Sequence, residues 1–302
     1  MADRDAQAVA PSISRTDAGW LALAVAAVST SAPLVREAAA PALAIAFWRN
    51  ALASAGLVPV AAASRRGRGV PARWWLLAAG AGVLLGAHFA AWISSLSSTT
   101  VAASVALVAT QPVWAALIGR VTGERLGRRA WTGIALALGG VIAMTGVDVT
   151  ASGRALRGDL LALLGGVLAA CYVSVGAVAR RRLTTTDYTA VCYSVAAVAL
   201  LVAALAAGQP LAGFGTRAWL CIAAITVGPQ LLGHSVFNRL LERVGATVVS
   251  VAILGEIVGA ALLAAWWFGE RPPAGLVPAA FGIVAGVVLV VRGRAAGGII
   301  PD

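Results

Sequence analysis

Long apolar runs alternate with short polar breaks along almost the whole chain. An α-helix rises 1.5 Å per residue, so about 20 residues cross a hydrocarbon core of about 30 Å. None of the runs alternates apolar and polar residues with a period of two, as the strands of a membrane barrel do. The pattern therefore predicts an all-α integral membrane protein with ten transmembrane helices. The predicted spans are residues 19–36, 41–62, 73–95, 100–121, 129–148, 158–179, 187–207, 217–238, 245–268 and 274–292.

The first run could instead belong to a secretory signal peptide, because Ala38-Ala39-Ala40 resembles a small-residue cleavage site. The apolar stretch from Trp20 to Val35 is long for the core of such a peptide, and equivalent runs follow it along the chain. We interpret it as the first retained helix. The pattern defines the breaks at 94–101 and 238–245 least well.

The composition excludes a soluble domain and a nucleic-acid partner. Of the 302 residues, 60% are apolar and 12% are charged, and the mean hydropathy is +0.88, which is too apolar for a water-exposed surface. All 23 basic residues are arginines, and they give a net charge of +11. On a soluble protein this charge would indicate nucleic-acid binding. Here the arginines gather in the breaks between apolar runs, a pattern typical of membrane proteins.

The distribution of arginine also orients the chain. If the N-terminus starts in the cytoplasm, alternate segments place 17 arginines inside and five outside, while Arg49 falls within a helix. Cytoplasmic loops of membrane proteins carry the excess of positive charge. We therefore expect a multi-pass protein of the bacterial inner membrane, with an even number of spans and both termini in the cytoplasm.

A shift of 146 residues relates the two halves of the chain. It superposes Gly123-Glu124-Arg125 on Gly269-Glu270-Arg271, and it superposes His88 on His234, the only two histidines. Each half would contain five spans, and an odd number inverts the second half, as in many secondary transporters. The predicted organisation is a tail at 1–18, a first repeat at 19–148, a linker at 149–157, a second repeat at 158–292 and a tail at 293–302.

Motifs in both halves carry a resemblance to a known family. They are Ser31-Ala32-Pro33, the segment PALAIAFWR from Pro41 to Arg49, Gln111-Pro112-Val113 before Gly123-Glu124-Arg125, and Gly255-Glu256 before Gly269-Glu270-Arg271-Pro272. Over nearly its whole length the chain resembles EamA-type carriers of the drug/metabolite transporter superfamily. The resemblance implies two inverted five-helix repeats around a central cavity. It also implies transport, usually export, of small metabolites such as amino acids or drug-like solutes.

One position departs from the pattern of this family. Many relatives carry a proline directly after the glutamate, where this chain has Ile257. The helix break that such a proline causes is therefore expected to be absent from the ninth run.

Two charged side chains fall at membrane depth, where an unpaired charge is costly. Glu256 lies about eleven residues into the ninth run, and a carboxyl group that alternates between protonated and charged forms would couple transport to protons. The alternative is a fixed ion pair or a structural hydrogen bond. Arg49 could hold an anionic substrate group through its planar donor fork. It could also neutralise Glu256 or bind helix carbonyls, and the resemblance favours such a structural role.

His88 and His234 could relay protons or bind substrate, or they could serve as packing residues. Trp92 and Asn238 each follow a histidine by one turn on the same face. Two histidines are too few ligands to predict a metal. The other candidates for lining a cavity are polar or aromatic side chains away from the helix ends: Trp48, Gln111, Trp114, Tyr172, Tyr193 and Gln230. Such a set suits an amphipathic or aromatic solute, although some of the aromatics could instead face lipid.

Nothing in the sequence indicates an enzyme or a cofactor, because no P-loop and no hydrolase or metalloprotease motif occurs. The three cysteines form no CxxC pair. We interpret the two Gly-Glu-Arg segments as interfacial turns, with gate closure as the alternative. The glycines at 139–140, 165–166 and 255/259 are expected to permit close helix contact.

The sequence thus predicts a secondary active transporter of a small-molecule substrate, surrounded by membrane lipids, with a proton or another ion as candidate coupling partner. The alternative is a non-transporting membrane protein, either an intramembrane enzyme or a lipid-binding scaffold. The residues themselves indicate neither the direction of transport nor the oligomeric state.

Overall fold

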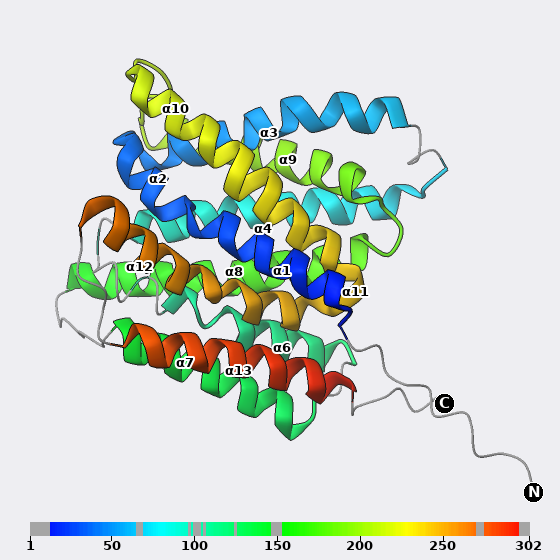
Figure 1. The fold of residues 1–302 in the computed structure, drawn as a ribbon. Coiled ribbons are helices and arrows are strands. Elements are labelled where there is room, and N and C mark those ends of the chain that lie inside the picture. The colour runs from blue at the N-terminus through cyan, green and yellow to red at the C-terminus, as the bar shows by residue number, and fades with distance from the viewer. Residues whose placement is uncertain are drawn as a thin grey trace, which may run out of the picture.

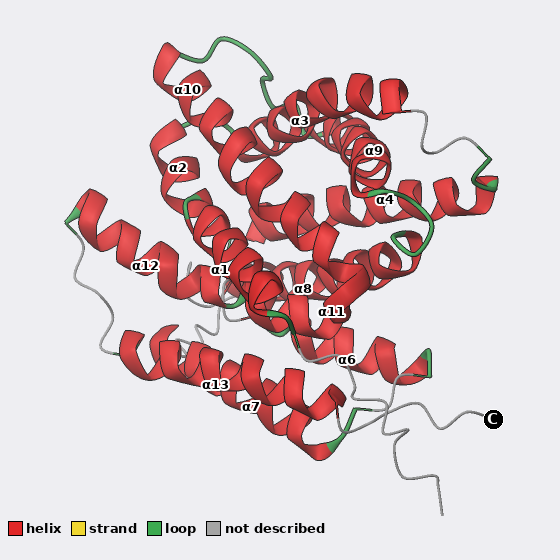
Figure 2. Ribbon diagram, turned by 45° about the vertical axis from the view of Figure 1, so that its right-hand side comes forward, coloured by secondary structure: helices red, strands yellow, loops and turns green. Residues whose placement is uncertain are grey.

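The computed structural model describes residues 13–64, 69–95, 98, 104, 107–123, 126–145, 153–269 and 275–295. Every regular element in these residues is a helix (Figure 1 and Figure 2). The prediction of an all-α protein is therefore confirmed. The helices are α1 (Arg15–Ser29), α2 (Ser31–Ala38), α3 (Ala42–Ser64), α4 (Ala72–Ser95), α6 (Gln111–Val121), α7 (Arg128–Thr145), α8 (Gly153–Ala179), α9 (Thr185–Ala206), α10 (Thr216–Ile225), the π-helix η1 (Thr226–His234), α11 (Ser235–Ile253), α12 (Gly255–Phe268) and α13 (Leu276–Ala295).

Six helical segments of the described chain are long and apolar enough to cross a membrane. The last of them has 53 residues and contains two of the predicted runs. Among the other predicted runs, α6 has only 11 residues and α7 ends at Thr145. The number of ten transmembrane helices therefore stays a prediction. The six segments are Arg15–Ala38, Ala42–Ser64, Ala72–Ser95, Gly153–Ala179, Thr185–Ala206 and Thr216–Phe268.

Large apolar side chains cover much of the outer surface. Leu76 on α4 is 71% exposed, and Phe281 on α13 is 73% exposed. Val198 and Val202 are exposed in the same way on α9. A surface of this kind is unfavourable in water but matches the hydrocarbon of a bilayer.

The helices of the two halves pack in matching pairs. α7 lies along α13, and α3 lies along α9; in Figure 1, α7 and α13 run side by side at the bottom of the molecule. The shift of 146 residues relates the two members of each pair. In addition, α1 packs on η1 and α12 as α8 packs on α4 and α6. Each of these contacts therefore occurs twice, and the first and second halves exchange roles between the two occurrences. A twofold relation between the repeats produces this arrangement.

Glycines permit the closest of these contacts. A Cβ atom added at Gly140 would lie 3.0 Å from the Ala279 Cα atom, and one at Gly282 would lie 2.9 Å from the Leu136 carbonyl oxygen. The backbones of α7 and α13 therefore touch, as small residues allow in membrane helices. Gly165 meets Trp92 in the same way, whereas Gly139 faces open space.

Three features interrupt the long run from Thr216 to Phe268. The π-helix η1 follows α10. Gly245 adopts φ 77° and ψ 163°, a conformation open essentially to glycine alone, and divides the run in two. The third interruption lies at Leu254, between α11 and α12.

The turn at Leu254 is local. The ninth run was expected to lack a proline-type break because Ile257 replaces the proline of many relatives, and Leu254 keeps helical backbone angles of φ −58° and ψ −23°. The Ile257 amide donates to the Leu254 carbonyl over 3.2 Å. This bond spans three residues in place of four, so the helix tightens locally without a proline.

Candidate functional site

Arg49 lies on the buried face of α3, which the helical spacing of Ala46, Arg49, Asn50 and Ala53 defines. Only 3% of its surface is exposed. Its Nε atom donates to Gln230 Oε1 over 2.8 Å. Its Nη1 atom donates to Ser31 Oγ over 3.4 Å. The Nη2 atom has no hydrogen-bond partner among the described residues, so part of this buried cation is left free for another acceptor.

Gln230 joins Arg49 to the second half of the chain. Its Nε2 atom donates to Asn50 Oδ1 over 3.0 Å, while its Oε1 atom accepts from Arg49. Gln230 lies within the π-helix η1, directly after Pro229. Proline has no N–H group and cannot continue the regular ladder of hydrogen bonds, which makes a local widening of the helix favourable.

A chain of polar side chains continues from Gln230 through α9, α11 and α8. The Tyr193 hydroxyl lies 3.5 Å from the Gln230 carbonyl oxygen and 3.2 Å from Ser235 Oγ. Asn238 Nδ2 donates to the Tyr193 oxygen over 3.3 Å, and the Tyr172 hydroxyl donates to Asn238 Oδ1 over 2.7 Å. The structure thus brings four of the predicted site residues into one hydrogen-bonded network with Arg49.

Both histidine rings lie near Phe89, whose ring also faces Arg49. The Arg49 Cζ atom is 4.9 Å from the Phe89 ring centroid. The centroids of the His88 and His234 rings are 5.1 Å and 6.2 Å from the same point. Arg49 and both histidines therefore belong to one neighbourhood around Phe89.

His88 presents a defined tautomer toward this neighbourhood. Its Nδ1 atom lies 2.9 Å from the Gly165 carbonyl oxygen. A carbonyl can only accept, so Nδ1 carries the proton and Nε2 of the neutral ring is an acceptor. The Trp92 ring stacks on His88 at 6.0 Å, and the Trp92 Nε1 atom is a second buried donor without a partner in the described residues.

Glu256 stands in the first turn of α12, directly after the interruption at Leu254. Its side chain is half-buried. Glu256 and Arg49 form no direct ion pair in the described part of the chain.

Besides His88, Trp92, His234 and Glu256, three predicted residues lie outside this hydrogen-bonded network. Trp48 Nε1 donates to the Leu211 carbonyl over 2.7 Å, and its ring packs against Trp219. Gln111 Nε2 donates to Ser250 Oγ over 3.1 Å, which ties α6 to α11. Trp114 Nε1 donates to Thr110 Oγ1 on its own helix over 3.0 Å.

The predicted Gly-Glu-Arg turns are described only at their glycines. Gly123 and Gly269 have φ values of 94° and 66°, as expected where a helix ends in a left-handed residue. Glu124, Arg125, Glu270 and Arg271 lie outside the described residues.

Sequence reasoning missed Ser31 and Ser235 as members of the network and missed the π-helix. Gly228-Pro229 in the middle of an apolar run was the available signal for the π-helix. Ser31 belongs to the motif Ser31-Ala32-Pro33, but the motif did not indicate its partner. No signal pointed to Ser235, because a serine in an apolar helix is common and its partner is set only by packing.

Three comparisons with known proteins bear on this site and fold. The sequence model of the EamA-like transporter family matches residues 17–146 and again residues 156–292. A Pseudomonas aeruginosa protein named uncharacterized protein PA1977 is 32% identical over 183 residues, which are 59% of this chain and 60% of that protein. The match thus spans about three fifths of this relative's length.

A protein of known crystal structure also superposes on the chain. The TM-score is 0.74, with 91% of this chain and 96% of the other covered and 20% of the residues identical. A likeness at this level of identity shows a shared fold.

Proposed function

Because the chain belongs to the EamA-like transporter family, whose sequence model matches both halves, we propose that it is a secondary active transporter working by alternating access. The chain is a multi-pass membrane protein of a transporter family. The proposal adds that it carries small metabolites, as an exporter, across the bacterial inner membrane, with both termini in the cytoplasm.

The proposed architecture is two inverted repeats, 19–148 and 158–292, with five transmembrane helices each. Two observations support it. The contacts of α1 with η1 and α12 repeat as contacts of α8 with α4 and α6. The family's sequence model also matches the chain twice, once in each half.

Matching interruptions in the two halves support a binding site between them. Before α6, the Val113 amide donates to the Thr110 carbonyl over 2.9 Å, and before α12 the Ile257 amide donates to the Leu254 carbonyl over 3.2 Å. Broken helices at corresponding positions of two inverted repeats commonly hold the substrate of secondary transporters near the middle of the membrane. Glu256 lies at the second of these breaks.

The free Nη2 atom of Arg49 is the observation that carries the proposed site. A buried donor without a partner costs about 1–3 kcal/mol. A solute that supplies an oxygen acceptor removes this cost, and a carboxylate fits the planar guanidinium best. Trp92 Nε1 offers a second donor, while Glu256 is suited to a cationic group or a proton. This combination favours amino acids or similar zwitterions.

The test begins with thermal unfolding of the purified protein against amino acids and related zwitterions, at pH 6 and pH 8. A ligand that binds the native state raises the melting temperature by mass action. Any ligand found is then tested for saturable counterflow in reconstituted vesicles. We expect Arg49→Gln and Trp92→Phe to weaken the ligand's effect, and Arg73→Gln, at an exposed position of α4, to leave it unchanged.

Two results would overturn the proposal. If Arg49→Gln and Trp92→Phe bind the ligand as tightly as the unmodified protein, the site lies elsewhere. If no solute shows counterflow, the protein is a non-transporting membrane protein. Proton coupling has its own test: Glu256→Gln should abolish accumulation driven by a pH gradient but keep counterflow at equal pH, and undiminished gradient dependence would reject it.

A further inference from the structure

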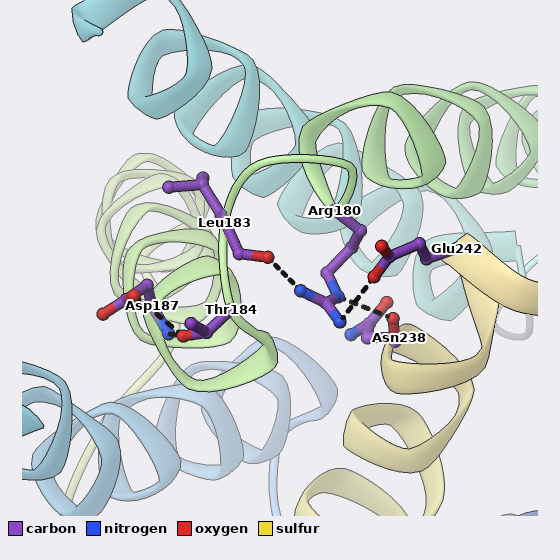
Figure 3. Close-up of polar contacts among 6 residues, drawn as sticks. All are labelled: Arg180, Leu183, Thr184, Asp187, Asn238 and Glu242. Atoms are coloured by element: carbon purple, nitrogen blue, oxygen red, sulfur yellow. Dashed lines mark hydrogen bonds and ion pairs between the residues drawn. The ribbon is translucent and has the colours of Figure 1, made fainter. Parts of the chain in front are cut away.

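A cavity lined by basic side chains lies at the end of the bundle where α8 passes into α9. Its volume is about 610 Å³. It is bounded by the segment that joins the two helices and by one turn of α11 (Figure 3). The lining residues are Arg180–Thr186, Arg239 and Glu242. Four guanidinium groups and one carboxylate thus line a shallow cavity that is open to the surroundings.

Arg180 and Glu242 neutralise each other and hold the wall of the cavity. Arg180 Nη2 lies 3.4 Å from Glu242 Oε2, and Arg180 Nε donates to the Asn238 carbonyl over 3.1 Å. The Nη1 atom donates to the Leu183 carbonyl (Figure 3). Only 6% of the Arg180 surface is exposed. Its hydrogen-bond donors are already paired within the protein, so Arg180 stabilises the wall of the cavity and is not available to a ligand.

Three further arginines remain as uncompensated charges. Arg181, Arg182 and Arg239 are exposed, and none of them forms an ion pair with another described residue. The Arg239 Cζ atom lies 5.4 Å from the Trp20 ring centroid. This contact orients the guanidinium without neutralising it. The cavity therefore keeps a net positive charge after Glu242 has been paired.

Hydroxyl groups complete the lining. The Thr184 hydroxyl is occupied, because it donates to Asp187 Oδ2 over 2.8 Å and accepts from the Asp187 amide (Figure 3). Thr185 and Thr186 stand in the first turn of α9, and their side chains make no described hydrogen bond. Guanidinium forks, hydroxyls and the first amides of a helix are the groups that bind phosphate oxygens.

Two neighbouring residues place this cavity at the level of the lipid headgroups. Trp20 is partly buried beside Arg239, and tryptophan gathers at the membrane surface together with arginine. Val178, two residues before Arg180, is 39% exposed, so apolar surface begins directly beside the basic groups. A molecule with a phosphate head and an acyl tail satisfies both surfaces.

We infer that the cavity lined by Arg181, Arg182, Arg239, Thr185 and Thr186 binds the phosphate group of an anionic phospholipid. Its wall touches the polar network through the bond from Arg180 to the Asn238 carbonyl, but the inference does not depend on the proposed function. The bound phosphate bridges the α8–α9 segment to α11, so its expected effect is to stabilise this end of the bundle.

The test compares lipid nanodiscs of pure phosphatidylcholine with nanodiscs that contain one part in five of phosphatidylglycerol. The variant R181Q/R182Q/R239Q removes the three uncompensated charges. The matched control R73Q/R128Q/R129Q removes the same number of exposed arginines from the starts of α4 and α7. Retention of phosphatidylglycerol by the protein is measured by native mass spectrometry, and thermal unfolding in pure phosphatidylcholine checks that both variants fold.

We expect the cavity variant to bind phosphatidylglycerol about 100-fold more weakly, since each of the three arginines near the surface contributes to anionic lipid binding. The control should bind as the unmodified protein does. Equal binding by the two variants would overturn the inference. A further arm adds inorganic phosphate in pure phosphatidylcholine. If phosphate alone stabilises the unmodified protein as strongly as the lipid does, and not the cavity variant, the assignment to a lipid is wrong.

Discussion

At the scale of single residues, the decisive feature is a buried cation that its neighbours satisfy only in part. The sequence predicts the depth of Arg49 and of Gln230, because both interrupt apolar runs. It does not predict that they meet, since 181 residues separate them and the contact depends on how η1 turns the glutamine side chain. The partners of Arg49 are thus a property of tertiary packing that no local pattern contains.

Replacing Gln230 by leucine tests how much this contact contributes. The substitution removes the acceptor of Arg49 Nε and the donor to Asn50 Oδ1. Hydrogen bonds to charged groups contribute about 1.5–3 kcal/mol each, so we expect the free energy of unfolding to fall by about 2 kcal/mol. The measurement is thermal or denaturant unfolding in detergent.

Gln209→Leu is the matched control. Gln209 Oε1 accepts from the Leu43 amide over 3.3 Å at the edge of the bundle, and this neutral bond should contribute about 1 kcal/mol or less. If both variants lose the same free energy of unfolding, the bond to Arg49 contributes no more to stability than the neutral bond of Gln209.

At the scale of helices, the interruptions decide where the candidate site lies. The sequence predicts the apolar runs because their composition is uniform over about 20 residues. It predicts the interruptions poorly, since one of them arises without proline, at Leu254, and another rests on the single residue Gly245. The placement of Glu256 in the first turn of α12 follows from the turn at Leu254, and it was not predicted, because Ile257 stands where a proline would have indicated a break.

Gly245→Ala should destabilise the protein. The backbone at Gly245 has φ 77°, which costs a residue with a Cβ atom about 1–3 kcal/mol. Gly139→Ala is the control, because Gly139 lies within α7 with open space around it. Alanine is favoured over glycine in a helix by about 1 kcal/mol, so unfolding temperatures should shift in opposite directions. A fall of the same size in both variants would contradict the role given to Gly245.

At the scale of the whole molecule, ion pairs join the first helical segment to the second half at both ends. Glu37 in α2 pairs with Arg217 in α10, and Asp17 in α1 pairs with Arg243 in α11 over 3.2 Å. In each pair the arginine is exposed and the carboxylate is mostly buried. Because water reaches each arginine, such a pair contributes only about 1 kcal/mol, so neither end is held firmly. The internal repeat predicts a relation between the two ends of the bundle. The ion pairs at the two ends are formed by different residues, and they were not predicted from the sequence.

Cross-links at the two ends test alternating access. The background is a protein whose three native cysteines are replaced by alanine. In the double variant E37C/R217C, a cleavable thiol-reactive cross-linker joins α2 to α10, and in D17C/R243C it joins α1 to α11. A transporter must open both ends in turn, so each cross-link should stop counterflow and its cleavage should restore it. Continued counterflow with either end cross-linked would contradict the mechanism.

The unpartnered donors on Arg49 and Trp92 also determine which molecules the site excludes. A membrane protein is surrounded by acyl chains, which are far more concentrated than any metabolite. A chain entering the site would leave both donors unpaired, at about 1–3 kcal/mol each, whereas an oxygen-bearing solute would not. Each donor therefore disfavours hydrocarbon by roughly 5- to 150-fold relative to such a solute. The same two N–H groups that would select a carboxylate thus keep the site from being filled by the bilayer itself.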